Sequence, residues 1–295
     1  MIGDTGLVAA LSAFAASDVG RASALADQAA AVHPEPLAIA AAAHLRQVVA
    51  RGSVDVYASP DGFAAFIRAG GNVPLYRETS AAYAEALRQH RALPALDLGT
   101  GDGRALLPAL EQVSARVVAV EPSAALAGEL RARADARTLA VEVLEATAQA
   151  ITRDPALRSA RFGLCASTFA LQSLPRADRM QVLGWLRDHC RTLAIAEFDA
   201  PDLSPPYADD TLRDLVARYR RGVAEYAACP EPAVSGFLMP VLFGYFAAGR
   251  SRTVWEQPVG AWISDLRAAG FLRVRSRPLF PYWWAEAHWI TADAP

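Results

Sequence analysis

Residues 95–104 read Ala-Leu-Asp-Leu-Gly-Thr-Gly-Asp-Gly-Arg, which combines a short apolar strand, a turn with three glycines and the start of a helix. Gly99, Gly101 and Gly103 permit positive φ angles and a close approach of the backbone to a ligand. Asp97 falls at the carboxyl end of the strand, the edge of a parallel sheet where ligands bind. A carboxylate there suits a cationic amine better than a phosphate, so the stretch predicts a site for a ligand with an ammonium group.

The chain around this turn alternates strands and helices, which favours a parallel sheet with helices on both faces. We expect strands at 96–98, 116–120, 139–144, 162–167 and 193–198. Helices are expected at 104–113, 123–134 and 177–190. After an interruption at 201–251, the pattern predicts a helix at 259–270 and strands at 272–278 and 283–291.

A glycine turn between a strand and a helix also occurs in dinucleotide-binding proteins, but the spacing Gly-x-Gly-x-x-Gly is absent. The Asp-x-Gly-x-Gly-x-Gly string, with the closing helix and strand pair, resembles the class I S-adenosylmethionine-dependent methyltransferases of the small-molecule, natural-product type. The resemblance covers residue 94 to the C-terminus. It implies an α/β fold with a Rossmann-like seven-stranded sheet, mostly parallel with the last strand antiparallel, and an N-terminal helical cap.

Further positions match the cofactor site of that family. Glu121 ends the second expected strand, 24 residues after Asp97, where a carboxylate can accept both hydroxyls of a ribose. The resemblance places the adenine-reading turn at Glu145 and Ala146, although the family's usual acid there is Asp. Other expected cofactor contacts are Pro122, Ser167, and the aromatic residues Tyr57 and Tyr76, whose ring faces attract a sulfonium cation.

Candidate catalytic residues lie at the carboxyl edge of the expected sheet. Glu197 and Asp199 end the fifth strand, where either acid could orient or deprotonate an acceptor. His288 is the one histidine near the expected pocket. The family's frequent acid at Gly163 and its histidine pair at 172–173 are absent, which removes one familiar candidate base.

The domain boundaries follow from the same pattern. Residues 1–90 are expected to form a helical N-terminal domain that acts as a lid and could make a homodimer. Residues 91–295 are expected to form the S-adenosylmethionine-binding catalytic domain, with a helical, aromatic insertion at 201–251. Such an aromatic stretch favours a planar or apolar substrate.

Composition excludes several classes of partner. The formal charge is −2, with 29 Lys and Arg against 31 Asp and Glu, so nothing predicts attraction to nucleic acid or to an anionic membrane. The three cysteines are scattered without a Cys-x-x-Cys spacing, and the five histidines lie in separate elements. We therefore expect neither disulfides nor a metal, and a cytoplasmic location.

The sequence favours transfer of a methyl group from S-adenosylmethionine to an O, N or activated C atom of a small-molecule acceptor, in secondary metabolism. S-adenosylhomocysteine would be the product. Two alternatives remain open at this point. One is an enzyme of the same fold that consumes the cofactor without methyl transfer, by a cyclisation that releases methylthioadenosine. The other is a protein that binds the cofactor as a regulator or scaffold.

Overall fold

The computed structural model describes residues 2–52, 60–203, 207–228, 230–247 and 254–295. It divides the chain into two compact units: a helical unit, Met1–Val73 with Leu203–Ser251, and a sheet unit, Pro74–Asp202 with Arg252–Pro295. The sequence pattern predicts a domain boundary near residue 90, with residues 201–251 as an insertion in the catalytic domain. In the structure, the segment after residue 203 instead packs with the N-terminal helices, where α10 contacts α1 and α3.

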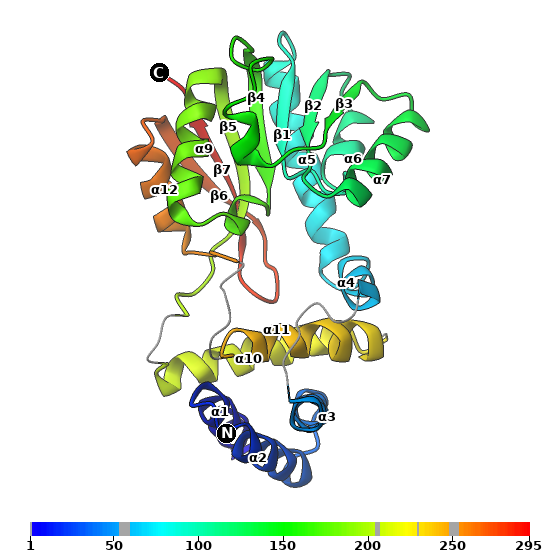
Figure 1. The fold of residues 1–295 in the computed structure, drawn as a ribbon, viewed down its shortest axis with the longest axis vertical. Helices are drawn as coiled ribbons and strands as arrows, with labels where there is room; N and C mark the ends of the chain where they lie inside the picture. Colours follow the sequence, from blue (N-terminus) through cyan, green and yellow to red (C-terminus); the bar gives the residue numbers. More distant parts are fainter. Residues whose placement is uncertain (1, 53–59, 204–206, 229, 248–253) are drawn as a thin grey trace. The chain divides into compact units, whose positions relative to one another are not determined.

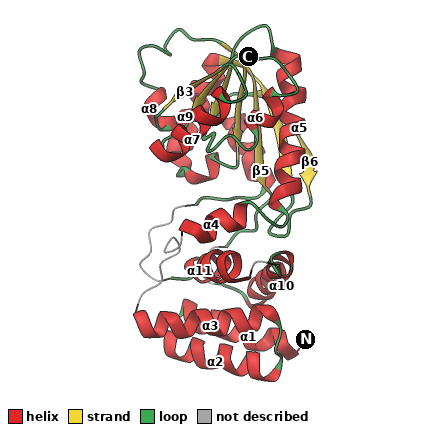
Figure 2. Ribbon diagram, turned by 90° about the vertical axis from the view of Figure 1, so that its right-hand side faces the viewer, coloured by secondary structure: helices red, strands yellow, loops and turns green. Residues whose placement is uncertain are grey.

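The sheet unit contains a seven-stranded sheet of order β3-β2-β1-β4-β5-β7-β6 (Figures 1 and 2). Both pairings of β7 are antiparallel and the other pairings are parallel, so β7 alone runs against the rest. This confirms the expected fold class. The strands are β1 (Ala95–Leu98), β2 (Val117–Val120), β3 (Val141–Leu144), β4 (Phe162–Thr168), β5 (Cys190–Phe198), β6 (Leu272–Phe280) and β7 (Ala287–Asp293).

Helices cover both faces of this sheet (Figure 1). One apolar core joins the sheet to α5, α6 and α7, and a second joins its other face to α8, α9 and α12. Burial on both faces explains why β1 and β4 are almost continuously apolar. The helices are α5 (Asn72–His90), α6 (Leu106–Leu110), α7 (Ala124–Asp135), α8 (Ala148–Ile151), α9 (Arg176–His189) and α12 (Val259–Ala268), with a 3-10 turn, η1 (Leu171–Ser173).

Two details of the sheet unit differ from the sequence expectation. The last strand begins at Ala287 rather than at residue 283, because residues 281–286 form the connection between β6 and β7. The short helix α8 had not been expected. The edge strand β6 is largely exposed and carries Arg273, Arg275 and Arg277. Such charges oppose pairing with a foreign strand.

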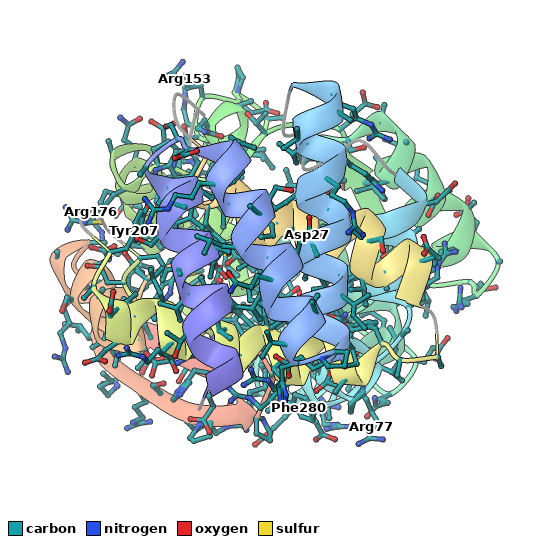
Figure 3. The ribbon with its side chains drawn as sticks, turned by 90° about the horizontal axis from the view of Figure 1, so that it is seen from below. Asp27, Arg77, Arg153, Arg176, Tyr207 and Phe280 are labelled. Carbon is teal, nitrogen blue, oxygen red and sulfur yellow. The ribbon has the colours of Figure 1, made fainter. Side chains whose placement is uncertain are left out.

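The helical unit consists of α1 (Ile2–Ala15), α2 (Val19–Val32), α3 (Pro36–Arg51), α4 (Pro60–Ile67), α10 (Asp209–Glu225), a π-helix, η2 (Pro230–Leu238), and α11 (Met239–Gly244). Helices α1, α2 and α3 lie side by side, as Figure 3 shows, within the stretch expected to be helical. Asp27 of α2, labelled there, pairs with Arg46 of α3 at 2.7 Å. Glu35 forms a bidentate pair with Arg220 of α10, at 2.7 and 2.8 Å. No helix in the described part of the chain is long and apolar enough to cross a membrane.

The helical unit contains one histidine whose protonation opposes folding. His44 of α3 stacks on Phe243 with 5.3 Å between ring centroids, and its Nε2 is buried without a hydrogen-bond partner among the described residues. Burial, aided by the charge of Arg51, lowers the pKa of His44 from 6.5 to about 4. Below pH 6.5 the unfolded chain therefore binds a proton that the folded chain does not, so stability falls as the pH drops towards 4.

We expect His44→Phe to reduce this acid sensitivity, by up to about 3 kcal/mol near pH 4. The measurement is urea unfolding followed by helical circular dichroism, because all six tryptophans lie in the sheet unit and do not report on α3. Equal pH dependence in wild type and variant would disprove the assignment to His44.

Candidate functional site

The glycine turn has the geometry that its sequence predicts. Gly99, Gly101 and Gly103 have φ angles of +69°, +60° and +82°, a region that other residues rarely adopt. A Cβ atom at Gly99 would overlap the Cβ of Ala170, and one at Gly103 would lie 2.7 Å from Leu107 and Leu130 side-chain atoms. A Cβ at Gly101 would meet nothing within 4 Å. Two of the glycines therefore serve packing, whereas the third borders open space.

Asp97 lies in β1 beside this turn and is 1% exposed. Its Oδ1 has no hydrogen-bond partner among the described residues. Burial, opposed by contacts with Thr100 and Tyr83 and reinforced by Glu121, raises the pKa of Asp97 from 3.8 to about 7. A buried carboxyl group without a cation is costly to ionise, and it becomes a strong acceptor once a cation is supplied.

Glu121 follows β2 and connects the glycine turn to Ser123, the residue before α7. Its Oε2 accepts the Gly101 N–H at 2.8 Å and its Oε1 accepts the Ser123 N–H at 2.9 Å. A carboxylate offers about four lone-pair sites, so both oxygens can accept a further hydrogen bond. This arrangement suits a pair of neighbouring hydroxyl groups.

We expect Glu121→Ala to weaken the binding of S-adenosylhomocysteine by about 100-fold or more, since two charge-assisted hydrogen bonds, each of about 1.5–3 kcal/mol, would be lost. The Gly101 N–H would also lose its acceptor, which loosens the turn. Calorimetric titration measures the change. As a control, Glu111→Ala removes an exposed carboxylate paired with Arg137 and should leave the affinity unchanged. Equal affinity in Glu121→Ala and wild type would contradict the role of Glu121.

The remaining residues expected at the cofactor site lie close to this edge of the sheet. Glu145 follows β3 and is exposed, next to Glu121 because the Glu121 N–H donates to the Leu144 carbonyl. Ala146 is half-buried and Pro122 is exposed. Ser167 donates its hydroxyl to the Leu98 carbonyl at 3.0 Å, so its side chain joins β4 to β1. Tyr57 lies outside the described residues.

Tyr76 approaches the glycine turn from α5. Burial raises the pKa of its phenol to about 12, with the nearby charges of Arg104 and Asp102 as smaller influences. Its ring meets Phe169 edge-on, with 6.0 Å between centroids. Tyr76 therefore lies near residues 102 and 104 of the turn, and its contact with a cofactor stays a prediction.

Sequence reasoning did not identify an aromatic row at the carboxyl edge of the sheet. Phe169 stacks on Phe198 at 4.7 Å, Phe198 stacks on Tyr282 at 5.3 Å, and Tyr282 contacts Trp283 at 5.5 Å. Phe169 has a φ of +54°, a strained conformation for a bulky residue, and such strain occurs most often at functional sites. The row could have been predicted from the positions of these residues in the sequence, directly after β4, at the end of β5 and in the β6–β7 connection.

Glu197 of β5 is 1% exposed and lies below the η1 turn. Its Oε1 accepts the Gln172 N–H at 3.2 Å, and its Oε2 has no hydrogen-bond partner among the described residues. Burial raises the pKa of Glu197 to about 8, although the Gln172 and Leu171 N–H groups and Arg179 oppose the shift. A carboxyl group in this state can exchange a proton near neutral pH.

The other two catalytic candidates are already engaged. The Asp199 carboxylate accepts the Val259 N–H at 2.7 Å, at the first residue of α12. His288 stands opposite Glu197 in the β5–β7 register, but its ring nitrogens lie 2.9 Å from the Ser276 hydroxyl and 3.0 Å from Glu286 Oε2. Both side chains therefore have polar partners, whereas the buried Oε2 of Glu197 has none among the described residues.

The donor and acceptor set fits an adenosyl amino acid. Asp97 offers a buried acceptor for an ammonium group and Glu121 offers acceptors for a ribose, while Gly101, which donates to Glu121, borders open space. In the part of the chain that the structure describes, no group of three or more His, Cys, Asp or Glu residues could bind a metal ion. Cys165 and Cys190 are buried and free, and Cys229 is not described.

The absence of the family's acid at Gly163 has a structural reason. A Cβ at Gly163 would overlap the carbonyl oxygen of His90, the last residue of α5. The end of this helix thus passes directly over β4. Position 172, where the family often has a histidine, is occupied by Gln172, whose N–H binds Glu197.

Comparison with known proteins places this site in a known fold. A family model described as a methyltransferase domain matches residues 95–192, which include β1 to the start of β5 and the glycine turn. A search of curated proteins gives no match. Among solved structures, the magnesium protoporphyrin IX methyltransferase of Synechocystis PCC 6803 with bound S-adenosylhomocysteine is similar at a TM-score of 0.50 and 13% identity, over 75% of this chain and 84% of that one. The 1,6-didemethyltoxoflavin-N1-methyltransferase of Burkholderia thailandensis has a TM-score of 0.49 at 20% identity, over 75% and 78% of the two chains.

Proposed function

We propose that the chain transfers a methyl group from S-adenosylmethionine to a small-molecule acceptor, because residues 95–192 match a family model described as a methyltransferase domain and lie in a seven-stranded sheet of the expected order. The observation that carries the proposal is Asp97. It is a buried carboxyl group with an acceptor oxygen that no described residue satisfies, beside a glycine turn that borders open space. An ammonium group is the partner that such a carboxylate requires.

Different residues would bind different parts of the cofactor. Asp97 would bind the ammonium group and Glu121 the ribose hydroxyls, while Tyr76 would contact the cofactor from the α5 side. Glu145 and Ala146, next to Glu121 at the same edge, would contact the adenine. When bound, S-adenosylmethionine supplies an electrophilic methyl group, so the protein has mainly to align the acceptor and exclude water.

The acceptor would bind along the aromatic row formed by Phe169, Phe198 and Tyr282. These rings lie at the carboxyl ends of β4 and β5 and in the β6–β7 connection, the sheet edge at which ligands of this fold class bind. Aromatic faces favour a planar or apolar acceptor. We further propose that this acceptor belongs to secondary metabolism.

Glu197 is the residue proposed to remove a proton from the acceptor. Its Oε2 has no partner among the described residues, and its pKa of about 8 suits exchange of a proton near neutral pH. Asp199 and His288 would instead support the site through α12 and through the β6–β7 pair.

The test is a screen of planar acceptors with S-adenosylmethionine that carries an isotopic label in the methyl group. Mass spectrometry should detect a labelled product, and fragmentation should identify the methylated atom. Release of methylthioadenosine from the cofactor alone, without any acceptor, would contradict methyl transfer and support the cyclisation alternative. Cofactor binding without turnover of any acceptor would support the role of a regulator.

We also propose a cytoplasmic protein that forms a homodimer through its N-terminal helices. Val32, Ile39 and Val49 of α2 and α3 are more than half exposed, at 66%, 51% and 52%. Exposed apolar side chains of this size are consistent with a partner surface. Light scattering should give twice the mass of the chain, 31.4 kDa; a monomer would exclude this part of the proposal.

A further inference from the structure

Tyr83 and Asp97 of the sheet unit each have a buried polar atom without a hydrogen-bond partner among the described residues, and each side chain influences the pKa of the other. Tyr83 of α5 is 0% exposed and Asp97 of β1 is 1% exposed. The Tyr83 hydroxyl and Asp97 Oδ1 each have no partner within hydrogen-bond geometry among the described residues, although the two groups interact electrostatically. Buried polar groups are nearly always satisfied, and each exception requires an explanation. The mutual influence on their pKa values shows that the two side chains lie near each other.

No cationic side chain of the described residues contributes to the pKa of Asp97. In the sheet register, Asp97 stands between Ala119 of β2 and Ala166 of β4, which have no polar side-chain atoms. Among the described residues, the titratable groups that interact with Asp97 are Tyr83 from α5, Glu121 after β2 and, from the other face of the sheet, Cys165 of β4, and none of these three is cationic. We therefore infer that a ligand supplies the positive charge that stabilises an ionised Asp97.

We propose that Tyr83 is a positioning residue of the cofactor site, whose hydroxyl donates to Asp97 once Asp97 is ionised by the ammonium group of the cofactor, so that cofactor binding releases a proton. The inference rests on the proposed function. To the proposed function it adds a residue that acts on the site without contacting the cofactor, and a pH dependence of the affinity for the cofactor.

The proton balance is simple. Without ligand near neutral pH, Asp97 is partly protonated, because burial raises its pKa to about 7. The ligand arrives with its amino group already charged. Asp97 gives its proton to solvent, the carboxylate pairs with the ammonium group, and the Tyr83 O–H satisfies the second oxygen. No oxidant, reductant or other reactant takes part.

Calorimetric titration of S-adenosylhomocysteine tests this, since it measures affinity without any methyl acceptor. In wild type we expect the affinity to be about tenfold weaker at pH 6 than at pH 8, with a midpoint near pH 7, and buffers of different ionisation enthalpy should report proton release.

The decisive variant is Tyr83→Phe, which keeps the buried ring and removes the hydroxyl. Because the hydroxyl lowers the pKa of Asp97, its removal should shift the midpoint upward by about half to one pH unit. Affinity near pH 8.5 should stay within about twofold of wild type, whereas affinity near pH 6 should fall several-fold. A merely structural role of Tyr83 would weaken binding equally at every pH.

Tyr219→Phe is the matched control, because it removes the hydroxyl of another fully buried tyrosine, in α10 of the helical unit. It should leave the midpoint unchanged. An unshifted midpoint in Tyr83→Phe, or a pH-independent affinity in wild type, would overturn the inference and leave the proposed function intact. Failure of wild type to bind S-adenosylhomocysteine at any pH would overturn both.

Discussion

Asp97→Asn should weaken the binding of S-adenosylhomocysteine by about 100-fold or more and, at the same time, make the ligand-free protein more stable. The substitution keeps the shape of the side chain but removes the charge that pairs with the ammonium group, a loss of about 3 kcal/mol or more for a buried pair. The gain in stability comes from the same burial. The pKa of Asp97 is about 7 in the folded chain against 3.8 in the unfolded one.

The sign of this effect follows from proton binding. Between about pH 4 and pH 7 the folded chain retains a proton on Asp97 that the unfolded chain has released, so stability falls as the pH rises through this window. At pH 8 the cost of ionisation is complete, and Asn should recover up to about 4 kcal/mol. Tryptophan fluorescence during urea unfolding measures the gain, because all six tryptophans lie in the sheet unit.

Asp293→Asn provides the control in the same unit. Asp293 ends β7 and pairs with Arg273 at 2.7 Å and with the Thr192 hydroxyl at 3.0 Å, at the edge of the sheet opposite the site. Its pKa is lowered, chiefly through Arg273 and Thr192 against a desolvation that acts the other way. The Asn variant should therefore lose stability and retain affinity. If Asp97→Asn bound S-adenosylhomocysteine within threefold of the wild-type affinity, Asp97 would have no role in binding the ligand.

The second large effect is a contrast between two glycines of one turn. Gly99→Ala should destabilise the sheet unit by about 3 kcal/mol, because the new methyl group overlaps Ala170 and the residue must keep a positive φ. Gly101→Ala should cost only about 1 kcal/mol, since its φ of +60° is strained for alanine but its Cβ meets nothing within 4 Å. Urea unfolding followed by tryptophan fluorescence should separate the two variants.

In contrast to its small effect on stability, Gly101→Ala should have a large effect on ligand affinity. Gly101→Ala would remain folded yet bind S-adenosylhomocysteine at least about tenfold more weakly, because the methyl group enters the space that borders the turn. Full affinity in Gly101→Ala would show that this space is not used by the ligand. Gly99→Ala with wild-type stability would contradict the packing of the turn against Ala170.

Much of the sheet unit could be predicted from sequence because its signals are local. The apolar runs of β1, β2, β4 and β5 and the glycine turn are each contained in a few consecutive residues, and Glu121 follows a recognisable strand. The strand order then follows from the resemblance. The predicted strand boundaries were less accurate where the composition does not change between a strand and a turn. Residues 281–286 are an example, because they are mostly apolar and aromatic but form the connection before β7.

Features that depend on contacts between distant segments could not be predicted. The grouping of 203–251 with the N-terminal helices depends on pairs such as Glu35 with Arg220, 185 residues apart. Tyr83 lies within a helix of ordinary composition, and only the register of α5 against β1 brings it to Asp97. Asp199 ends a strand as a ligand-binding residue would, but its carboxylate meets the Val259 N–H, 60 residues away.

The most direct test of the account compares two ligands on the wild-type protein. The glycine turn beside a buried carboxylate is proposed to bind an adenosyl amino acid, whereas a dinucleotide site would place phosphates at the helix N-terminus. Calorimetry near pH 8 should show that S-adenosylhomocysteine binds at least about 100-fold more tightly than NAD. Tighter binding of NAD than of S-adenosylhomocysteine would contradict the central claim.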